Sequence, residues 1–414
     1  MTALVVRANA RSLPLPNESV DLICTSPPYF GLRDYRDDGA SLKGQIGAEP
    51  TPAEYVASLL ECTREWMRVL KPEGSLWINL GDRYAGNVGT TSGHRGNRQT
   101  LLNGWSASRQ EDFDRSFRSQ PNRTGVTNKS LMGLPWRYAL GCIDDLGMIL
   151  RAEIIWSKPN GLPESVTDRV RRCHETWFHL VKQPRYYSAV DEIRTPASGY
   201  IRQNGAARAT PPGQKPRTMA DACNPLGALP GSVWEIAAQP LKVPEHLAVD
   251  HYAAFPPALV RRLVLGWSPP GICTACGEGR RPVVDKLGVF GGDNNPDSRN
   301  GSRRRSTMDG GSREWARRIA RPDRITGYAC ACPAPDAPTR PSLVVDPFGG
   351  TGTTALVASV HGRVGISCDL SHDYGRLARW RTRDQGERAR ALGVPKPPPV
   401  APEQGDLFAE DVIA

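Results

Sequence analysis

The stretch that decides the fold is Ser342-Leu343-Val344-Val345-Asp346-Pro347-Phe348-Gly349-Gly350-Thr351-Gly352-Thr353-Thr354-Ala355. Its apolar start predicts a short strand, its glycines a tight turn, and its last residues the beginning of a helix. The second half also fits G-x-G-x-x-A, a pattern typical of loops that hold nucleotide cofactors. The next apolar segment, Val364-Gly365-Ile366-Ser367-Cys368, predicts a second strand that ends at Asp369. We therefore expect a strand, helix and strand of an α/β fold around a cofactor-binding loop.

The run Asp346-Pro347-Phe348 stands directly before the glycines, and its carboxylate restricts the kind of ligand that the loop can bind. A carboxylate at the mouth of the loop repels a pyrophosphate but attracts an ammonium or sulfonium group. S-adenosylmethionine is such a ligand, and Asp369 would accept hydrogen bonds from its ribose hydroxyls. Two alternatives stay open: a glycine-rich turn without a ligand, and a nicotinamide-dependent oxidoreductase. The position of Asp346 counts against the oxidoreductase.

The composition fits a large, basic α/β protein. The 414 residues, 39% of them hydrophobic, are enough for one large domain with insertions or for two domains. The 53 Lys and Arg residues outnumber the 43 Asp and Glu residues and give a formal net charge of +10. That charge fits a polyanionic partner, or a basic soluble protein without one. No apolar run reaches membrane-spanning length and the first residues lack a signal-peptide layout, so we expect a cytoplasmic protein with no membrane partner.

A second loop near the start of the chain suggests the chemistry. The apolar run Val20-Asp21-Leu22-Ile23-Cys24 predicts a strand covered on both faces, and it leads into Thr25-Ser26-Pro27-Pro28-Tyr29. Two successive prolines cannot continue a sheet ladder or enter a helix interior, so they stiffen the loop. The carboxyl end of such a strand is where open α/β sheets bind their ligands.

The atoms of this loop suit methylation of an exocyclic base amine. The lone pair of such an amine is delocalised into the ring, and acceptors on its two hydrogens would free that lone pair. The Ser26 side-chain oxygen and the Pro27 carbonyl can be those acceptors, and Tyr29 offers a face for stacking an extruded base. The methyl group would then pass in line to nitrogen without a covalent enzyme intermediate. The alternative is a proline-stiffened turn with a structural role only.

With these two loops, the sequence resembles the DNA amino-methyltransferases, which modify N4 of cytosine or N6 of adenine. The Ser-Pro-Pro-Tyr loop precedes the Asp-Pro-Phe-Gly-Gly loop, which is similar to the permuted, beta-type order of that family. The resemblance implies S-adenosylmethionine as the cofactor and double-stranded DNA with a flipped-out base as the substrate. Members with serine at the first loop position mostly modify cytosine, so Ser26 favours cytosine N4, with adenine N6 as the alternative.

Other segments resemble the same family. Residues 54–70 have helical spacing, after which Lys71-Pro72-Glu73-Gly74 leads into a strand at 75–82. Phe255 precedes an expected helix at 257–265, in the segment that resembles the family's contact with the methionine end of the cofactor. The family usually has an aspartate at the end of the first strand to accept from the cofactor's adenine amine, and here Asn9 stands there. Its amide carbonyl can still accept that bond. Two further strands are expected within 151–160 and 176–182.

Four cysteines form two short-spaced pairs, Cys273-x-x-Cys276 and Cys330-x-Cys332. A Cys-x-x-Cys-Gly turn is the usual half of a tetrahedral zinc site, because it directs two thiolates at one ion. We therefore expect structural zinc on all four cysteines, with free thiols as the alternative and His251 as a weaker substitute ligand. Arginines between the pairs, from Arg303 to Arg324, would either track DNA phosphates or form a solvated charged loop.

We therefore expect an α/β, Rossmann-like methyltransferase fold with a mostly parallel sheet and an inserted zinc-binding module. Ring-carbon methylation of cytosine is disfavoured because it needs a nucleophilic cysteine, usually after proline, and the chain has no Pro-Cys dipeptide. A zinc-containing DNA-binding protein without catalysis is the non-enzyme alternative. A partner restriction endonuclease and the oligomeric state stay open.

The expected parts are the catalytic half at 1–82 and 131–190, a polar insertion at 83–130, a candidate target-recognition segment at 191–240, the cofactor half at 241–270 and 340–385, a zinc-ribbon-like insertion with a basic loop at 271–339, and a tail at 386–414.

Overall fold

The computed structural model describes most of the chain, and the account below concerns those residues only. They are residues 2–32, 35–37, 40–41, 44–86, 125–161, 163–164, 166–195, 226–247, 254–285, 324–334 and 336–396. Most of the polar insertion, the middle of the candidate recognition segment, the arginine-rich loop before Arg324 and His251 lie outside these ranges. Within them, no helix combines the length and the apolar character needed to cross a membrane.

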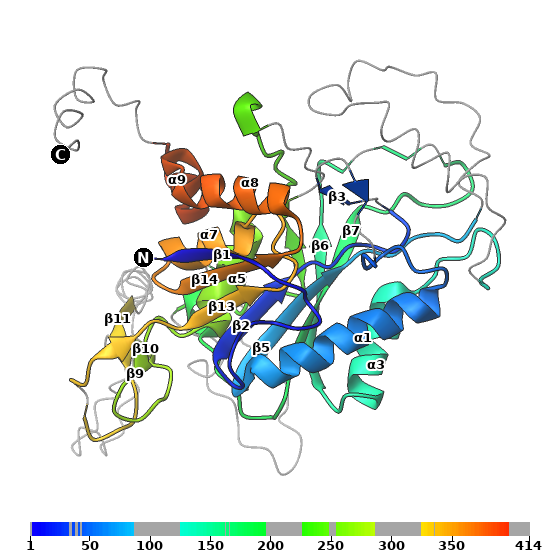
Figure 1. Ribbon diagram of the computed structural model, residues 1–414. Helices are drawn as coiled ribbons and strands as arrows, with labels where there is room; N and C mark the ends of the chain where they lie inside the picture. Colours follow the sequence, from blue (N-terminus) through cyan, green and yellow to red (C-terminus); the bar gives the residue numbers. More distant parts are fainter. Residues whose placement is uncertain are drawn as a thin grey trace, which may run out of the picture.

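One eight-stranded sheet organises the molecule (Figure 1). Neighbouring strands are parallel from β1 to β5, β7 runs antiparallel to both of its neighbours, and β8 pairs parallel with β6. The sheet is thus mostly parallel, as the sequence predicts. Its strands, in spatial order, are β1 (Ala3–Arg7), β14 (Val364–Asp369), β13 (Leu343–Asp346), β2 (Val20–Thr25), β5 (Leu70–Leu80), β7 (His174–Val181), β6 (Ile149–Ser157) and β8 (Val233–Glu235).

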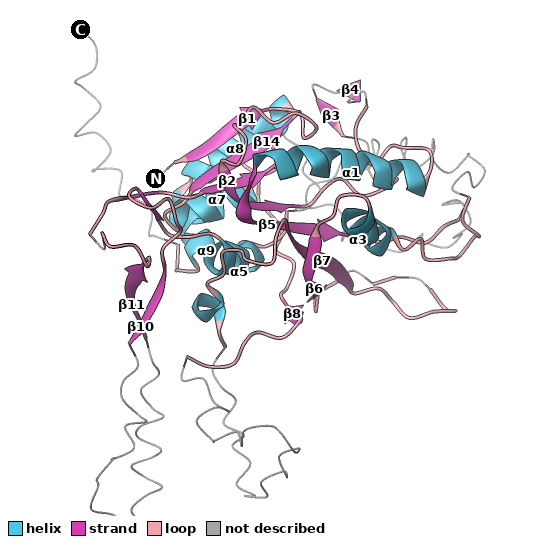
Figure 2. Ribbon diagram, turned by 90° about the horizontal axis from the view of Figure 1, so that it is seen from below, coloured by secondary structure: helices cyan, strands magenta, loops and turns pink. Residues whose placement is uncertain are grey.

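Helices cover both faces of the sheet, and Figure 2 shows α1 and α5 on opposite sides of β5. One core holds Ile23 and Ile78 from the face toward α1 (Pro52–Val69) and α3 (Leu134–Asp144). The other core holds Leu22 and Trp77 from the face toward α5 (Pro257–Trp267), α7 (Thr353–Val360) and α9 (Gln385–Leu392). Successive strand residues therefore enter opposite cores, as the period of two in a strand requires. The remaining helix, α8 (His372–Arg383), lies beside β1.

The helix predicted at 54–70 forms as α1, with a complete capping box. The Thr51 hydroxyl accepts from the Glu54 amide, and the Glu54 carboxylate accepts from the Thr51 amide. The following strand, however, begins at Leu70 rather than at Ser75. The early part pairs irregularly with β2, because the register shifts between Val20 and Leu22. Such a bulge accommodates Pro72, which has no amide hydrogen for a regular ladder.

A small module carries the four cysteines and stands beside the main sheet. Its parts are β9 (Ile272–Cys273) paired with β12 (Thr339–Arg340), and β10 (Arg281–Asp285) paired with β11 (Arg324–Ala329). Figures 1 and 2 show the β10–β11 hairpin projecting from the body. Only two residues separate β12 from β13, so the module connects directly to the strand that precedes the glycine-rich loop.

Four short elements complete the description. β3 (Arg36–Asp37) pairs with β4 (Ala40–Ser41), and η1 (Val190–Ile193) and η2 (Glu245–Leu247) are single 3-10 turns. The apolar piece of the candidate recognition segment forms β8, and Trp234 at its centre is buried in the core against α5. This piece therefore belongs to the main sheet, and residues 196–225 of that segment lie outside the described ranges.

Candidate active site

The candidate site is a cavity of about 490 Å³ at the carboxyl ends of the central strands. This is the edge where parallel sheets bind ligands. Both predicted loops line it: Ser26, Pro27, Pro28 and Tyr29 on one side, and Pro347, Phe348, Gly349, Gly350, Thr351 and Thr353 on the other, together with Asn9, Phe255 and Asp369. Two predicted residues, Asp346 and Gly352, are not among the lining residues.

The serine of the catalytic loop is held by an amide from the neighbouring strand. The Ser26 hydroxyl donates to Asn79 Oδ1 over 3.1 Å, and the Tyr29 hydroxyl lies 2.5 Å from the same oxygen. Asn79 is 1% exposed near the end of β5, and its Nδ2 donates to the Thr176 carbonyl. That bond fixes which end of the amide faces the loop. Because Ser26 uses its hydrogen on Asn79, its oxygen keeps lone pairs as an acceptor.

An ion pair closes the same end of the cavity. The Lys158 ammonium pairs with Glu175 Oε1, and Glu175 Oε2 lies 2.8 Å from the Tyr29 hydroxyl. Lys158 Nζ also lies 4.3 Å from the ring centroid of Trp156. A phenol has one hydrogen, so Tyr29 donates to Asn79 or to Glu175 but not to both at once. Burial and the Glu175 charge raise the pKa of Tyr29 well above its usual value, so it stays a neutral donor.

The loop itself is stiff and tightly packed. Tyr55 on α1 donates its hydroxyl to the Pro28 carbonyl over 2.9 Å. A Cβ at Gly81 would lie 2.5 Å from the Tyr29 ring, so only glycine leaves room for that ring. Tyr29 is therefore restrained at its ring and at its hydroxyl, as a stacking surface for a base requires.

The sequence predicts the Asp346 carboxylate at the mouth of the loop, but in the structure this carboxylate is buried among protein donors. It is 1% exposed and accepts from Thr25 Oγ1 at 2.6 Å, from Thr354 Oγ1 at 2.9 Å and from the Phe348 amide at 3.1 Å. Burial raises its pKa to about 7. In this conformation the carboxylate is thus directed at protein donors rather than at the cavity. It ties the end of β2, next to Ser26, to the glycine-rich loop.

The glycine-rich loop presents backbone atoms without side chains to the cavity at Gly349 and Gly350. A Cβ at Gly349 would lie 1.9 Å from Ser367 Oγ, and Gly352 has φ +75° with Ala378 directly above it. Gly350 donates its amide to Asp369 Oδ2 over 2.9 Å, while Asp369 Oδ1 accepts from the Ser371 amide. Asp369 therefore fixes the loop and also lines the cavity at the end of β14, where the sequence predicts the ribose contact.

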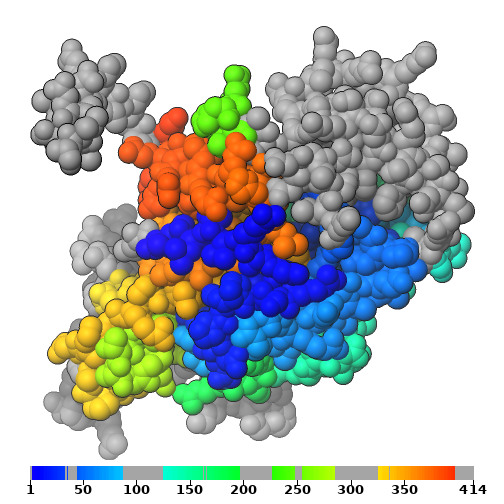
Figure 3. Space-filling view, in the orientation of Figure 1, coloured from blue at the N-terminus to red at the C-terminus, as the bar shows by residue number. Residues whose placement is uncertain are grey.

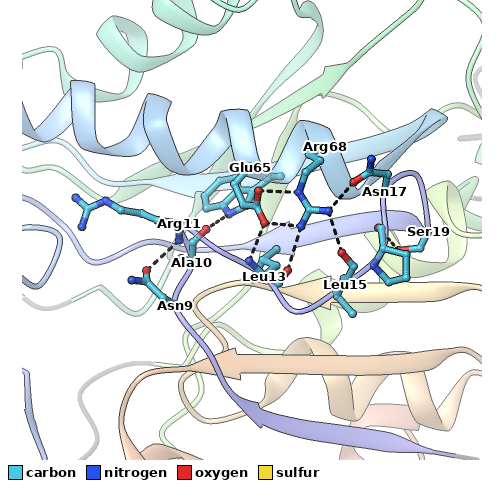
Figure 4. A network of polar contacts seen from close by, with 11 residues as sticks. Asn9, Ala10, Arg11, Leu13, Leu15, Asn17, Ser19, Glu65 and Arg68 are labelled. Carbon is cyan, nitrogen blue, oxygen red and sulfur yellow. Dashed lines mark hydrogen bonds and ion pairs between the residues drawn. The ribbon is translucent and has the colours of Figure 1, made fainter.

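The segment after β1 brings Asn9 to the cavity and is anchored to α1 (Figure 4). Asn9 Oδ1 accepts from the Arg11 amide over 3.0 Å. Glu65 accepts from the Leu13 amide and pairs with Arg68, whose guanidinium also donates to the Leu13 carbonyl. Figure 3 shows the N-terminal residues lying across this face beside the C-terminal helices. The segment that carries Asn9 is therefore anchored to α1 through Leu13.

The four cysteines meet in the small module, apart from the cavity. Their Sγ atoms all lie within 4.8 Å of one another, with 3.8 Å between Cys273 and Cys332 and 3.5 Å between Cys330 and Cys332. Four sulfurs on a tetrahedral zinc ion, with Zn–S bonds of about 2.3 Å, lie about 3.8 Å apart. The cluster thus has the dimensions of a four-thiolate zinc site. Hydrogen bonds from the Cys276 and Ala275 amides lower the pKa of Cys273 to about 6.

Sequence reasoning missed Asn79, Trp156, Lys158 and Glu175 as site residues. They come from three separate stretches of the chain, at the end of β5, at the end of β6 and at the start of β7. One signal was available: all four lie near the ends or beginnings of expected strands, where a sheet presents polar side chains to a ligand.

Comparisons with known proteins identify the family to which the chain is similar. The family model N6_N4_Mtase, described as DNA methylase, matches residues 20–274, which include the Ser-Pro-Pro-Tyr loop. The Type II methyltransferase M.XycI of Xanthomonas campestris pv. cyanopsidis is 35% identical over 258 residues, or 62% of this chain and 69% of that protein. M.SmaI of Serratia marcescens, also a Type II methyltransferase, is 36% identical over 258 residues, or 62% of this chain and 72% of that protein.

Among solved structures, a looser likeness is to the PvuII DNA methyltransferase (cytosine-N4-specific). That likeness has 17% identity and a TM-score of 0.49, over 94% of this chain and 92% of the other.

Proposed function

Because the chain belongs to the N6/N4 DNA methylase family and is an S-adenosylmethionine-dependent DNA methyltransferase, we propose that its target is the exocyclic N4 amine of cytosine in double-stranded DNA. The observation that supports catalysis by this loop is the Ser26 hydroxyl held by Asn79, whereas the choice of cytosine rests on the presence of serine at this position. The family membership sets aside the nicotinamide-dependent oxidoreductase that the G-x-G-x-x-A pattern left open.

The residues present fit the cofactor. The Gly349 backbone has no room for a Cβ, Asp369 stands at the end of β14, and both line the cavity with Asn9 and Phe255. We propose that Asp369 accepts from the ribose, that the Asn9 carbonyl accepts from the adenine amine, and that Phe255 contacts the methionine end. When bound, S-adenosylmethionine supplies an electrophilic methyl group on a sulfonium centre.

The chain's own residues prepare the amine. Ser26 Oγ and the Pro27 carbonyl accept the two amine hydrogens, which holds the nitrogen closer to tetrahedral geometry and frees its lone pair. The Tyr29 ring stacks on the flipped base, and its hydroxyl stays bonded to Glu175 or Asn79. Trp156 and Lys158 also line the cavity, and Lys158 pairs with Glu175, which lies beside the Tyr29 hydroxyl. No side-chain nucleophile is needed for this transfer.

Adenine N6 is the second candidate, since its amine presents the same two hydrogens to the same acceptors. Serine favours cytosine because most serine-bearing loops of the resembled family act there. Asp346 does not distinguish the two bases, because its carboxylate is directed at the loop backbone and two threonines.

The experiment that tests this proposal identifies the methylated nucleoside. The purified protein is incubated with unmodified genomic DNA and S-adenosylmethionine with a labelled methyl group, and the DNA is digested to nucleosides for mass spectrometry. We expect the label on N4-methylcytosine. Label on N6-methyladenine would keep the reaction and overturn the base, whereas bound cofactor with no labelled nucleoside would favour a DNA-binding protein without catalysis.

We also propose that Cys273, Cys276, Cys330 and Cys332 hold one structural zinc ion. The sulfur separations support this, because free thiols have no reason to converge at the spacing of a tetrahedral site. Cysteine thiolates would occupy all four coordination positions, so the ion would have no open coordination position for a substrate. Its contribution would be to fix the module that leads through β12 into β13 and the glycine-rich loop.

A further inference from the structure

The loop that joins β6 to β7, residues 158–173, projects from the edge of the sheet that holds the candidate active site. The Lys158 amide donates to the Cys173 carbonyl over 2.8 Å and closes the loop at its base. Because β7 is antiparallel to β5, the loop ends beside the carboxyl end of β5, where Asn79 lies. Lys158 and Glu175 pair with each other and line the cavity. The loop therefore stands at the rim of the cavity.

This loop presents an apolar side chain to solvent. Val170 is 85% exposed, the highest value among the large hydrophobic side chains in the described part of the chain. A single exposed valine is ordinary on a protein surface, so the exposure alone assigns no role. The place of the valine does, because it lies in sequence between Arg169 and Arg171 on a loop at the rim of the cavity.

Side-chain contacts hold the loop on both sides of the valine. Arg169 donates to Glu164 Oε2 over 2.7 Å and to the valine carbonyl over 3.0 Å. Its guanidinium also lies 3.9 Å from the ring centroid of Tyr84, which follows β5. On the other side, Arg171 Nη1 donates to the Gly161 carbonyl over 2.8 Å. The valine is thus exposed on a restrained backbone.

The charge of the loop favours duplex DNA as the partner of this side chain. Residues 158–173 contain four cations and two anions, namely Lys158, Arg169, Arg171 and Arg172 against Glu164 and Asp168. Such an excess attracts phosphates to the rim of the cavity. An apolar side chain between cations matches a duplex, which has phosphates outside and stacked bases inside.

We propose that Val170 enters the base stack when the target base is extruded into the cavity. An amine inside a duplex is out of reach of the cavity, so its base must leave the stack and give up its stacking contacts. An inserted apolar side chain restores part of that contact, and a β-branched side chain loses little rotamer freedom when it inserts. Val170 is a positioning residue, because it does not touch the reacting atoms. The proposal rests on the proposed function for DNA as the substrate.

The test compares two duplexes that differ only opposite the target base. The methylated site is first mapped in genomic DNA, and oligonucleotides are then made in which the target base faces its normal partner or an abasic site. Val170→Ala should lower kcat/KM about three- to tenfold on the paired duplex, because two methyl-sized groups lose their burial. On the abasic duplex the loss should stay below about twofold, because extrusion of an unpaired base costs less.

Two further variants separate insertion from a general effect on the protein. Val170→Leu keeps an apolar side chain at this position, so we expect kcat/KM on the paired duplex within about twofold of the wild type. Val394→Ala is the matched control, because Val394 is 52% exposed, follows α9 and does not line the cavity. It should match the wild type on both duplexes.

Equal losses of Val170→Ala on the two duplexes would overturn the insertion and leave the methyltransferase assignment intact. Unchanged kcat/KM of this variant on the paired duplex would overturn it as well. A wild type that methylates no DNA would overturn the proposed function, and the insertion with it.

Discussion

Ser26, Asn79 and Tyr29 come from three separate stretches of the chain, and a single amide oxygen joins them. Asn79 Oδ1 lies within hydrogen-bond distance of both hydroxyls, and its own Nδ2 is committed to a backbone carbonyl. The amide therefore cannot turn over without losing three contacts. This arrangement leaves the Ser26 oxygen as an acceptor and keeps the Tyr29 ring in place.

At the residue scale, the ring and the hydroxyl of Tyr29 should contribute separately to kcat/KM. Tyr29→Ala removes the stacking face and should lower kcat/KM about 10- to 100-fold, since stacking of a base on an aromatic ring contributes about 1–3 kcal/mol. Tyr29→Phe keeps the ring and loses one hydrogen bond, which should cost about three- to tenfold. Steady-state kinetics on one DNA substrate measure both variants. Equal losses would mean that the hydroxyl, and not the ring, is what the reaction needs.

At the scale of elements, the backbones of α7 and β14 pack in close contact at Gly365 and Ala355. A Cβ at Gly365 would lie 2.3 Å from the Ala355 carbonyl oxygen, a contact that a backbone cannot relieve cheaply. Gly365→Ala should therefore lower the free energy of unfolding by about 1–3 kcal/mol, measured by urea denaturation. Gly327→Ala, on β11, is the matched control, because nothing lies within 4 Å of its added Cβ. Unchanged stability of Gly365→Ala would contradict this packing.

The antiparallel strand β7 carries a buried histidine with a predictable pH dependence. His179 is 2% exposed, is stacked 4.4 Å from Trp77 and lies 3.0 Å from Ser75 Oγ. Burial lowers its pKa from 6.5 to about 3. The folded state thus binds this proton less tightly than the unfolded state, so the stability is full above pH 6.5 and falls as the pH drops toward 3.

That loss should reach on the order of 5 kcal/mol at the acid end, from about 1.4 kcal/mol per pKa unit. Urea denaturation at a series of pH values should show a smaller acid loss in His179→Phe than in the wild type. His246→Phe, at an exposed position on η2, should keep the wild-type pH dependence. Identical slopes in all three proteins would rule out a neutral buried His179.

These elements also show which structural features can be predicted from the sequence alone. The strand, turn and helix around the glycines and the strand into Ser26 are local patterns, and the structure forms them where they are predicted. The orientation of Asp346 was not accessible, because it depends on Thr25, which is 321 residues away in the chain. The contacts of Glu175 and Lys158 likewise depend on strand register, which no single motif sets.

At the scale of the whole molecule, we propose that the cysteine module is the part whose stability depends on a metal. We expect about one zinc ion per purified chain by elemental analysis, and a lower melting temperature after chelation, since binding contributes to folding. Cys330→Ser should reduce the zinc content, whereas Cys173→Ser, outside the cluster, should not. A soluble, zinc-free wild type would contradict the site.

We propose that methyl transfer takes place where Asn79 holds Ser26. The most direct measurement is the single-turnover rate of methyl transfer by Ser26→Ala, beside its dissociation constant for S-adenosylmethionine. We predict a rate about 10²- to 10³-fold below wild type, as for loss of one positioned polar group, and a dissociation constant within about threefold. Ser19→Ala, whose hydroxyl donates to Pro16 outside the cavity, should match wild type in both. An unchanged rate, or equal losses in rate and cofactor affinity, would contradict the claim.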